Sequence, residues 1–283
     1  MKIKAVLIFL LAFSLFLGGC SSFGNNNNTP QPAQPDPVVE TPEVWRPETV
    51  YYSDLGVSQQ SKDDLSKAGV KITASRFTYY EDEIGRIQYH LIIEWQNNGK
   101  TPLLATTAHI VLYDTDHNQV NTPATVDAVY GIMSVGQKDY LYSSGYIYKE
   151  DMEKLNYDIS KGLIPYMEGM VQIQECQTNT SNTYTFVECE TDFTRGTLED
   201  GRIAFSGTIT NPIEKDFPMY KIHFLLYDAL GSIIAVQPGY IRDLNAKQTA
   251  DIPTTVVLNW AITPDMIAAV KVAAQQWWRP ASN

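Results

Sequence analysis

Cysteine, histidine and basic residues are scarce in this chain of 283 residues. It holds three Cys and four His, too few for a disulfide scaffold or a multi-cysteine zinc module. Lysine and arginine total 21 against 32 acidic residues, which gives a formal net charge of −11. A chain with this balance offers no broad basic surface to the phosphates of nucleic acids or to anionic lipid headgroups. We therefore expect no nucleic-acid partner.

Catalytic motifs are missing as well. The sequence contains no His-Glu-x-x-His, G-x-S-x-G or Ser-x-x-Lys, so metalloprotease, hydrolase and penicillin-binding chemistries have no visible base or nucleophile. Asn98 to Thr101 resembles the end of a P-loop, but Glu94 stands where its first glycine is required. Asp114 to Asn118 begins like a calcium loop and lacks the glycine and final glutamate of an EF-hand. We expect no enzyme, no metal and no cofactor.

The first twenty residues have the pattern of an export signal. Lys2 and Lys4 give a positive start, and the apolar run from Ala5 to Leu17 is too short to span a bilayer as a permanent helix. The run ends in Leu17-Gly18-Gly19-Cys20, which resembles the lipobox of bacterial lipoproteins. The resemblance implies a signal peptide at residues 1–19 and a lipidated Cys20 that anchors the chain outside the cytoplasm. An ordinary signal peptide that contains a cysteine is the alternative.

Residues 20–47 cannot form a hydrophobic core. They include four consecutive asparagines and six prolines. Proline at this density favours polyproline II, with a rise of about 3.1 Å per residue. We expect a disordered linker that holds the folded part up to roughly 80 Å from the lipid. Trp45 is the one feature of this linker that suggests docking on the folded part.

The rest of the chain contains an internal repeat. Phe77-Thr78, followed after a fixed interval by Gly85-Arg86-Ile87, matches Phe193-Thr194 followed by Gly201-Arg202-Ile203. Asn97 and Asn211 each stand seventeen residues before an aspartate, Asp114 in the first repeat and Asp228 in the second. Residue identity also pairs Lys138 with Lys247 and Pro165 with Pro264. The matches predict two homologous domains over residues 70–176 and 183–283, with an extension at 48–69 and a linker at 177–182.

Within each repeat the hydrophobic period is two. Ile87, Tyr89, Leu91, Ile93 and Trp95 alternate with residues that are mostly polar, and the segment 203–209 alternates in the same way. This pattern predicts half-buried strands. Turn residues at 83–85 and 199–201 place hairpins before them. We therefore predict an all-β fold of two tandem immunoglobulin-like antiparallel β-sandwich domains.

A short motif near the middle of each repeat indicates a family. Phe224 to Asp228 reads F-x-L-Y-D, and Ile110 to Asp114 differs only in having Ile for the leading Phe. Both segments resemble the signature of the FxLYD domain. The resemblance implies a small extracytoplasmic β-sandwich of bacterial surface lipoproteins, without established catalysis. In physical terms the motif is structural, because the aspartate opens a turn by accepting backbone N–H bonds.

Two groups of side chains are candidates for sites. Tyr140, Tyr142, Tyr146 and Tyr148 form either an interaction patch for a glycan or protein or cross-strand pairs that only stabilise the sheet. Once Cys20 is lipidated, Cys176 and Cys189 remain. They form either a disulfide that closes a loop of about fourteen residues or free thiols.

Together these features predict a membrane-anchored cell-envelope lipoprotein that acts as a non-enzymatic interaction or structural module. Its partners are the membrane, through the N-terminal lipid, and a protein or cell-wall component that the sequence does not identify. The alternative is glycan or peptidoglycan binding through the tyrosine patch of the first domain.

Overall fold

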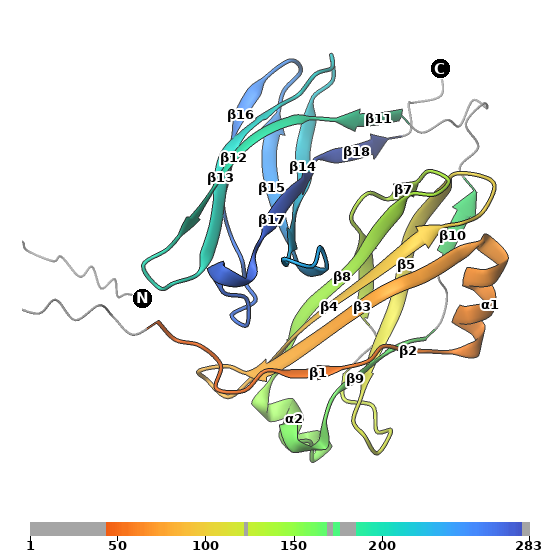
Figure 1. Ribbon diagram of the computed structural model, residues 1–283, viewed down its shortest axis with the longest axis vertical. Coiled ribbons are helices and arrows are strands. Elements are labelled where there is room, and N and C mark those ends of the chain that lie inside the picture. The colour runs from red at the N-terminus through yellow and green to blue at the C-terminus, as the bar shows by residue number, and fades with distance from the viewer. Residues whose placement is uncertain (1–43, 122–123, 169–171, 176–184, 279–283) are drawn as a thin grey trace, which may run out of the picture. The chain divides into compact units, whose positions relative to one another are not determined.

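The computed structural model describes residues 44–121, 124–168, 172–175 and 185–278 (Figure 1). The fold is mostly β, and its antiparallel sheets lie in two regions. The predicted signal peptide, Cys20 and residues 20–43 of the predicted linker lie outside the described residues. No helix in the described ranges is long and apolar enough to cross a membrane.

The first region comprises β1 to β10 and the described helices α1 and α2. The bounds are β1 Tyr51–Ser53, β2 Gly56–Val57, α1 Gln59–Ala68, β3 Val70–Glu81, β4 Ile87–Asn97, β5 Leu103–Tyr113, β6 Ala124–Ala128, β7 Ile132–Met133, β8 Lys138–Ile147, α2 Lys149–Leu155, a 3-10 turn Ile159–Lys161, β9 Ile164–Met167 and β10 Gln172–Glu175.

The strands of the first region form one sheet in the order β1-β3-β4-β8-β6-β5-β9-β2, and β7 and β10 also pair with β5. The sequence led us to expect two separate sheets, but β6 pairs with β8 and joins them. The segment 48–69, predicted as an N-terminal extension, supplies β1, which pairs with β3, and β2, which pairs with β9. It also carries helix α1.

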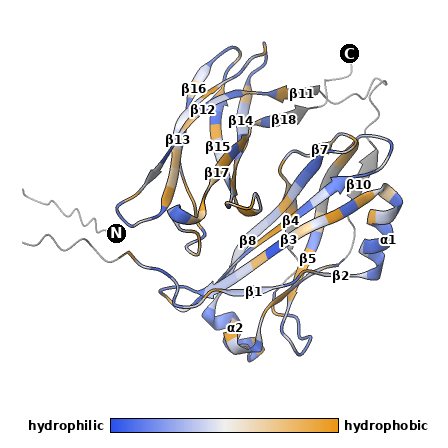
Figure 2. Cartoon of the chain, in the orientation of Figure 1, coloured by the Kyte–Doolittle hydropathy of each residue, from blue (hydrophilic) through white to orange (hydrophobic). Residues whose placement is uncertain are grey.

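Helix α1 follows β2 and is capped at both ends. The Ser58 side chain accepts a hydrogen bond from the Ser61 N–H at 3.1 Å, and Gly69 ends the helix with φ of 71°. Most of the helix is hydrophilic (Figure 2), and Leu65 is its buried apolar residue. The helix thus covers one end of the core and exposes the rest of its surface.

The second region comprises β11 to β18 in three small sheets, β12-β13-β16, β15-β14-β17 and β11-β18. The bounds are β11 Thr185–Glu188, β12 Glu190–Thr197, β13 Ile203–Thr210, β14 Phe217–Tyr227, β15 Ile233–Leu244, β16 Thr249–Val256, a 3-10 turn Pro264–Met266, β17 Ala269–Ala273 and β18 Gln275–Trp278.

The two regions use the same order of strand pairings. The hairpin β3-β4 extends to β8 as β12-β13 extends to β16. Strand β5 pairs with β6 and β9 as β14 pairs with β15 and β17. The predicted turns 83–85 and 199–201 are confirmed, and Gly85 and Gly201 adopt φ of 77° and 76° there. The segment that carries α2 has no counterpart in the second region.

The structure corrects two of the residue matches. The backbone N–H of Asn97 donates to Gln137 at 3.0 Å, and that of Asn211 donates to Gln248 at 2.9 Å, so Lys138 corresponds to Thr249 and not to Lys247. Pro165 lies in β9, whereas Pro264 lies in a 3-10 turn before β17. These matches were wrong because they relied on residue identity across loops of unequal length.

A buried asparagine occupies the same position in both regions. Asn97 is fully buried, and its Nδ2 donates to the carbonyls of Thr101 at 2.9 Å and Met133 at 3.1 Å. Its Oδ1 accepts from the Gly99 N–H at 2.9 Å. Asn211, also fully buried, makes the corresponding three bonds to Lys215, Asn245 and Ile213. Each asparagine thus ties a loop to the turn before the next strand.

The aspartates of the two F-x-L-Y-D-like motifs also act alike. Oδ1 of Asp114 accepts from the N–H groups of Asp116 at 2.9 Å and Asn118 at 2.8 Å. Oδ1 of Asp228 accepts from Leu230 at 2.9 Å and Ser232 at 2.8 Å. The turn role expected for these carboxylates is confirmed.

Strand β4 is buried on both faces, although the sequence predicted a half-buried strand, and most of β14 is buried as well. The odd residues from Ile87 to Trp95 pack in the core of the first region as predicted. On the opposite face, Ile92 packs with Leu225, Tyr227 and Ile233 of the second region. The outer faces of the two central strands therefore take part in one apolar interface, which we call the seam: Ile92, Val129, Tyr140, Leu225, Tyr227, Ile233 and Ala273.

The segment that leads into β1 contacts both regions. The Arg46 guanidinium donates to the carbonyls of Gly201 at 2.9 Å and Trp260 at 3.1 Å. The Trp45 ring lies 5.4 Å from that of Trp260 and 6.5 Å from that of Tyr80. Residues 44–47, predicted as the end of a disordered linker, are thus docked on the folded part.

Candidate functional site

The four tyrosines of the predicted patch fall into two environments. Tyr140 is only 7% exposed, and its hydroxyl lies 3.2 Å from that of Tyr227 in the seam. The Tyr142 hydroxyl lies 3.2 Å from Nε2 of His223. Tyr146 and Tyr148 are exposed. The sequence could not separate the two pairs, because the seam forms only when the two regions pack.

Burial shifts the pKa values of the polar side chains near the seam. Burial, together with a smaller effect of the charge of Lys221, lowers the pKa of His223 to about 3, so the imidazole is neutral at physiological pH. Burial also raises the pKa of Tyr140 and brings that of Tyr130 to about 12. Tyr140 and His223 hydrogen-bond as neutral side chains, and we assign them a structural role.

The exposed pair of tyrosines borders a groove of about 640 Å³. Tyr146, Tyr148 and Leu155 supply apolar surface, while Gln119, Asp151 and Lys154 supply polar groups at its border. The Arg86 guanidinium lies 4.3 Å from the centre of the Tyr146 ring and is itself bound to Asp82 at 2.7 Å. This contact fixes one face of Tyr146 and leaves Tyr148 as the more accessible ring.

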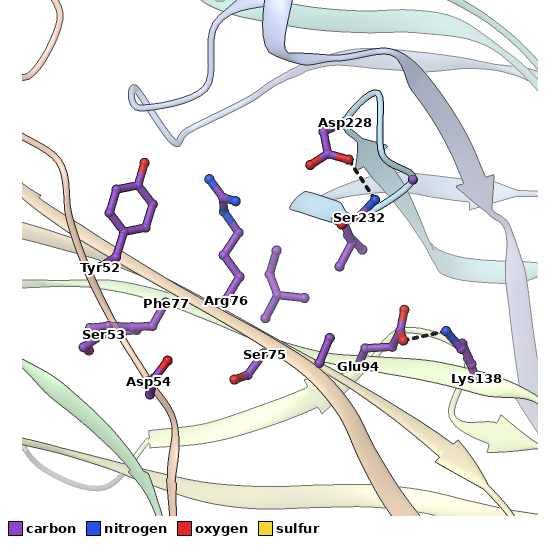
Figure 3. A pocket seen from close by; sticks show the side chains of 14 residues that line it. Tyr52, Ser53, Asp54, Ser75, Arg76, Phe77, Glu94, Lys138, Asp228 and Ser232 are labelled. Carbon is purple, nitrogen blue, oxygen red and sulfur yellow. Dashed lines mark hydrogen bonds and ion pairs between the residues drawn. The ribbon is translucent and has the colours of Figure 1, made fainter.

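A second groove, of about 660 Å³, lies between β3 and the turn after β14 (Figure 3). The turn carries Asp228 and Ser232, and Tyr52 lies on the opposite side. The Arg76 side chain points into the groove between them (Figure 3), with its guanidinium carbon 5.5 Å from the Tyr52 ring centre. Ile92 and Ile233 add apolar wall. We call this site the Arg76 groove.

Two acidic residues of the Arg76 groove, Glu94 and Asp228, already have partners. Glu94 accepts from Lys138 Nζ at 2.7 Å and from Thr73 Oγ1 at 2.6 Å. Burial opposes ionisation of Glu94, but these hydrogen bonds bring its pKa below the usual value. Asp228 is engaged by the two backbone N–H groups of its turn. Both carboxylates therefore accept hydrogen bonds from donors within the protein.

Arg76 has no such partner. Arg46, Arg86, Arg195 and Arg202 each bind a carbonyl or carboxylate oxygen. Within the described ranges Arg76 makes no hydrogen bond or ion pair, and its Nε is buried without an acceptor. A half-buried guanidinium with free donors is matched to a planar, bidentate oxyanion such as a carboxylate. Sequence reasoning missed this residue, because nothing local distinguishes it from a surface arginine on a strand.

The other candidates are less informative. Cys20 and Cys176 lie outside the described residues, and Cys189 is buried with a free thiol, so the 176–189 bridge stays a prediction. Burial raises the pKa of the Cys189 thiol, which disfavours a reactive thiolate. In the described part of the chain, no group of three or more His, Cys, Asp or Glu side chains is placed to hold a metal ion.

Comparison with known proteins adds no family. No protein-family model matches the chain, and no curated protein does. The resemblance of the two motifs to the FxLYD domain therefore stays a prediction from the sequence.

Proposed function

We propose that the chain is a lipid-anchored protein of the bacterial cell envelope that binds a partner without catalysing a reaction. In this proposal Cys20 carries the lipid, and two immunoglobulin-like domains of the FxLYD type form the binding body. The linker holds that body away from the membrane, and the partner is a protein or cell-wall component outside the cytoplasm.

The observation that carries the proposal is the duplication of a structural unit in which the buried Asn and Asp side chains hydrogen-bond to the backbone of turns and loops. The asparagine pair and the aspartate pair repeat the same bonds in both regions. The seam then packs the two central strands together. Function in such a scaffold is expected in the grooves and loops that it positions, and the two grooves above are lined from several strands and turns.

Proximity labelling in the native cell tests the proposal. A labelling enzyme is fused to the chain, and the labelled proteins are compared with those from a Cys20→Ser chain, which is exported without the lipid. We expect the wild type to fractionate with membranes and to label a reproducible set of envelope proteins that the Cys20→Ser chain loses. Labelling of cytoplasmic proteins, or equal labelling by both chains, would contradict the proposal.

A second candidate function is glycan binding at the groove beside Tyr148. The combination of an exposed aromatic ring with amide, carboxylate and ammonium groups at its border favours it, because sugar rings stack on aromatic faces while their hydroxyls bond polar groups. Binding of an N-acetylglucosamine oligomer should be lost in Tyr148→Ala. It should persist in Tyr52→Ala, which removes a tyrosine of similar exposure elsewhere. Equal binding by both variants would exclude this site.

A further inference from the structure

Part of the outer edge of β3 has no neighbouring strand. β1 pairs with β3 only from Phe77 to Tyr79, and no other strand in the described ranges pairs with that side of β3. Thr73, Ala74 and Ser75 are consecutively exposed. A register shift follows Ile72, after which Ala74, Ser75 and Arg76 pair regularly with β4. Alternate backbone N–H and C=O groups along this short edge are therefore open to an added strand.

The Arg76 groove runs along this edge. Its lining includes Ala74, Ser75 and Arg76 on β3 and Tyr52, Ser53 and Asp54 at the end of β1. The pairing of β1 with β3 ends before Asp54, so an added strand would pair with β3 at the residues just beyond the end of β1. The free guanidinium of Arg76 lies at the point where the two would meet.

We propose that this groove binds an extended peptide segment that pairs with the Ala74–Arg76 edge and places a carboxylate on Arg76. Backbone pairing supplies the orientation and the side-chain contacts supply the selectivity, as in other strand additions. Ile92 and Ile233 receive an apolar side chain of the peptide. This assignment rests on the binding role proposed above and names its partner class.

Charge complementarity selects an acidic segment. Glu94 binds Lys138 at 2.7 Å, and Asp228 accepts from two backbone N–H groups of its own turn. Neither carboxylate binds Arg76. Arg76 is therefore the cationic side chain of the lining that has no anionic partner. Asp54 is exposed, and it forms no ion pair with Arg76 although the register of β1 and β3 would place the two opposite each other. Asp54 repels an acidic ligand weakly from the border of the groove, where solvent screens its charge.

The test uses synthetic peptides and the soluble chain from residue 21. The probe is acetyl-Thr-Val-Glu-Val-Thr-amide, and its counterparts are the same peptide with Gln for Glu and a backbone N-methylated form. Binding is followed by NMR chemical-shift titration. We expect the Glu peptide to bind about tenfold more tightly than the Gln peptide, the scale of one charge-assisted bidentate contact, and the N-methylated peptide to lose binding.

Variants assign the effect to Arg76. Arg76→Gln should weaken the Glu peptide about tenfold and the Gln peptide less than twofold, and Arg76→Lys should fall between because it keeps charge without the bidentate fork. Lys71→Gln removes an equal charge from an exposed position on β3 outside the lining and should change neither. Asp54→Asn should tighten the Glu peptide slightly.

Three results would overturn the assignment. They are equal affinity for the Glu and Gln peptides, unchanged binding in Arg76→Gln, or full binding of the N-methylated peptide. Removal of residues 21–43 should leave the affinity unchanged, and a gain would show that the acidic linker of the same chain occupies the groove instead of a partner. Because these titrations need neither lipid nor cell, they can fail while the labelling experiment succeeds, and the reverse.

Discussion

The buried asparagines give a quantitative test of the duplication. In Asn211→Ala, three hydrogen bonds are lost, those to the carbonyls of Lys215 at 2.7 Å and Asn245 at 2.9 Å and that from the Ile213 N–H at 3.2 Å. At about 1 kcal/mol for each neutral bond, the substitution should lower the free energy of unfolding by about 3 kcal/mol. Asn97→Ala loses the three corresponding bonds and should cost about the same.

Urea unfolding of the soluble chain, followed by far-ultraviolet circular dichroism, measures these costs. The matched control is Asn118→Ala, which removes an exposed asparagine with one side-chain bond to Asp114 and should cost less than about 1 kcal/mol. If the two buried variants differed by more than about 2 kcal/mol, or if either matched the control, the equivalence of the two asparagines would be refuted.

Three other perturbations probe separate parts of the structure. Gly85 and Gly201 occupy the same hairpin position with positive φ, so alanine at either should cost about 1–2 kcal/mol in thermal unfolding. Only Gly201→Ala also overlaps Val44, and it alone should speed proteolysis before residue 47. The pKa of His223 is about 3 in the folded protein, below its value of about 6.5 in the unfolded chain. His223 therefore does not reduce the free energy of unfolding above about pH 6.5, and it reduces that free energy increasingly as the pH falls from about 6.5 towards 3. His223→Gln should flatten this fall by up to about 1.4 kcal/mol per pH unit, and an unchanged slope would count against a neutral buried ring. Tyr140→Phe should cost about 1 kcal/mol through the lost bond to Tyr227, and no cost at all would argue against that contact.

Local patterns predicted much of the sheet structure. The alternation from Ile87 to Trp95 identified the core face of β4, and the glycines at 85 and 201 identified both hairpins. These features follow from side-chain period and backbone sterics, which act within a few residues. Helix α1 was also within reach, because Ser58 and Gly69 are typical cap residues, but its polar surface gave little hydrophobic periodicity.

The features that depend on packing between distant segments were not predicted. Ile92 lies on the face of β4 that the sequence pattern assigns to solvent, and it is buried because it packs in the seam. The same packing buries Tyr140 and leaves Tyr146 exposed, although both residues lie on β8. Arg76 becomes a candidate ligand group only because the turn at Asp228 and the end of β1 enclose it. Such arrangements have no local signature in the sequence.

Export and lipid attachment are tested most directly by the mass of the N-terminal peptide of the protein purified from native membranes. We predict a mature chain that begins at Cys20 and carries a diacylglyceryl group on its sulfur. A chain that still begins at Met1, or one whose Cys20 is an unmodified thiol, would contradict the account.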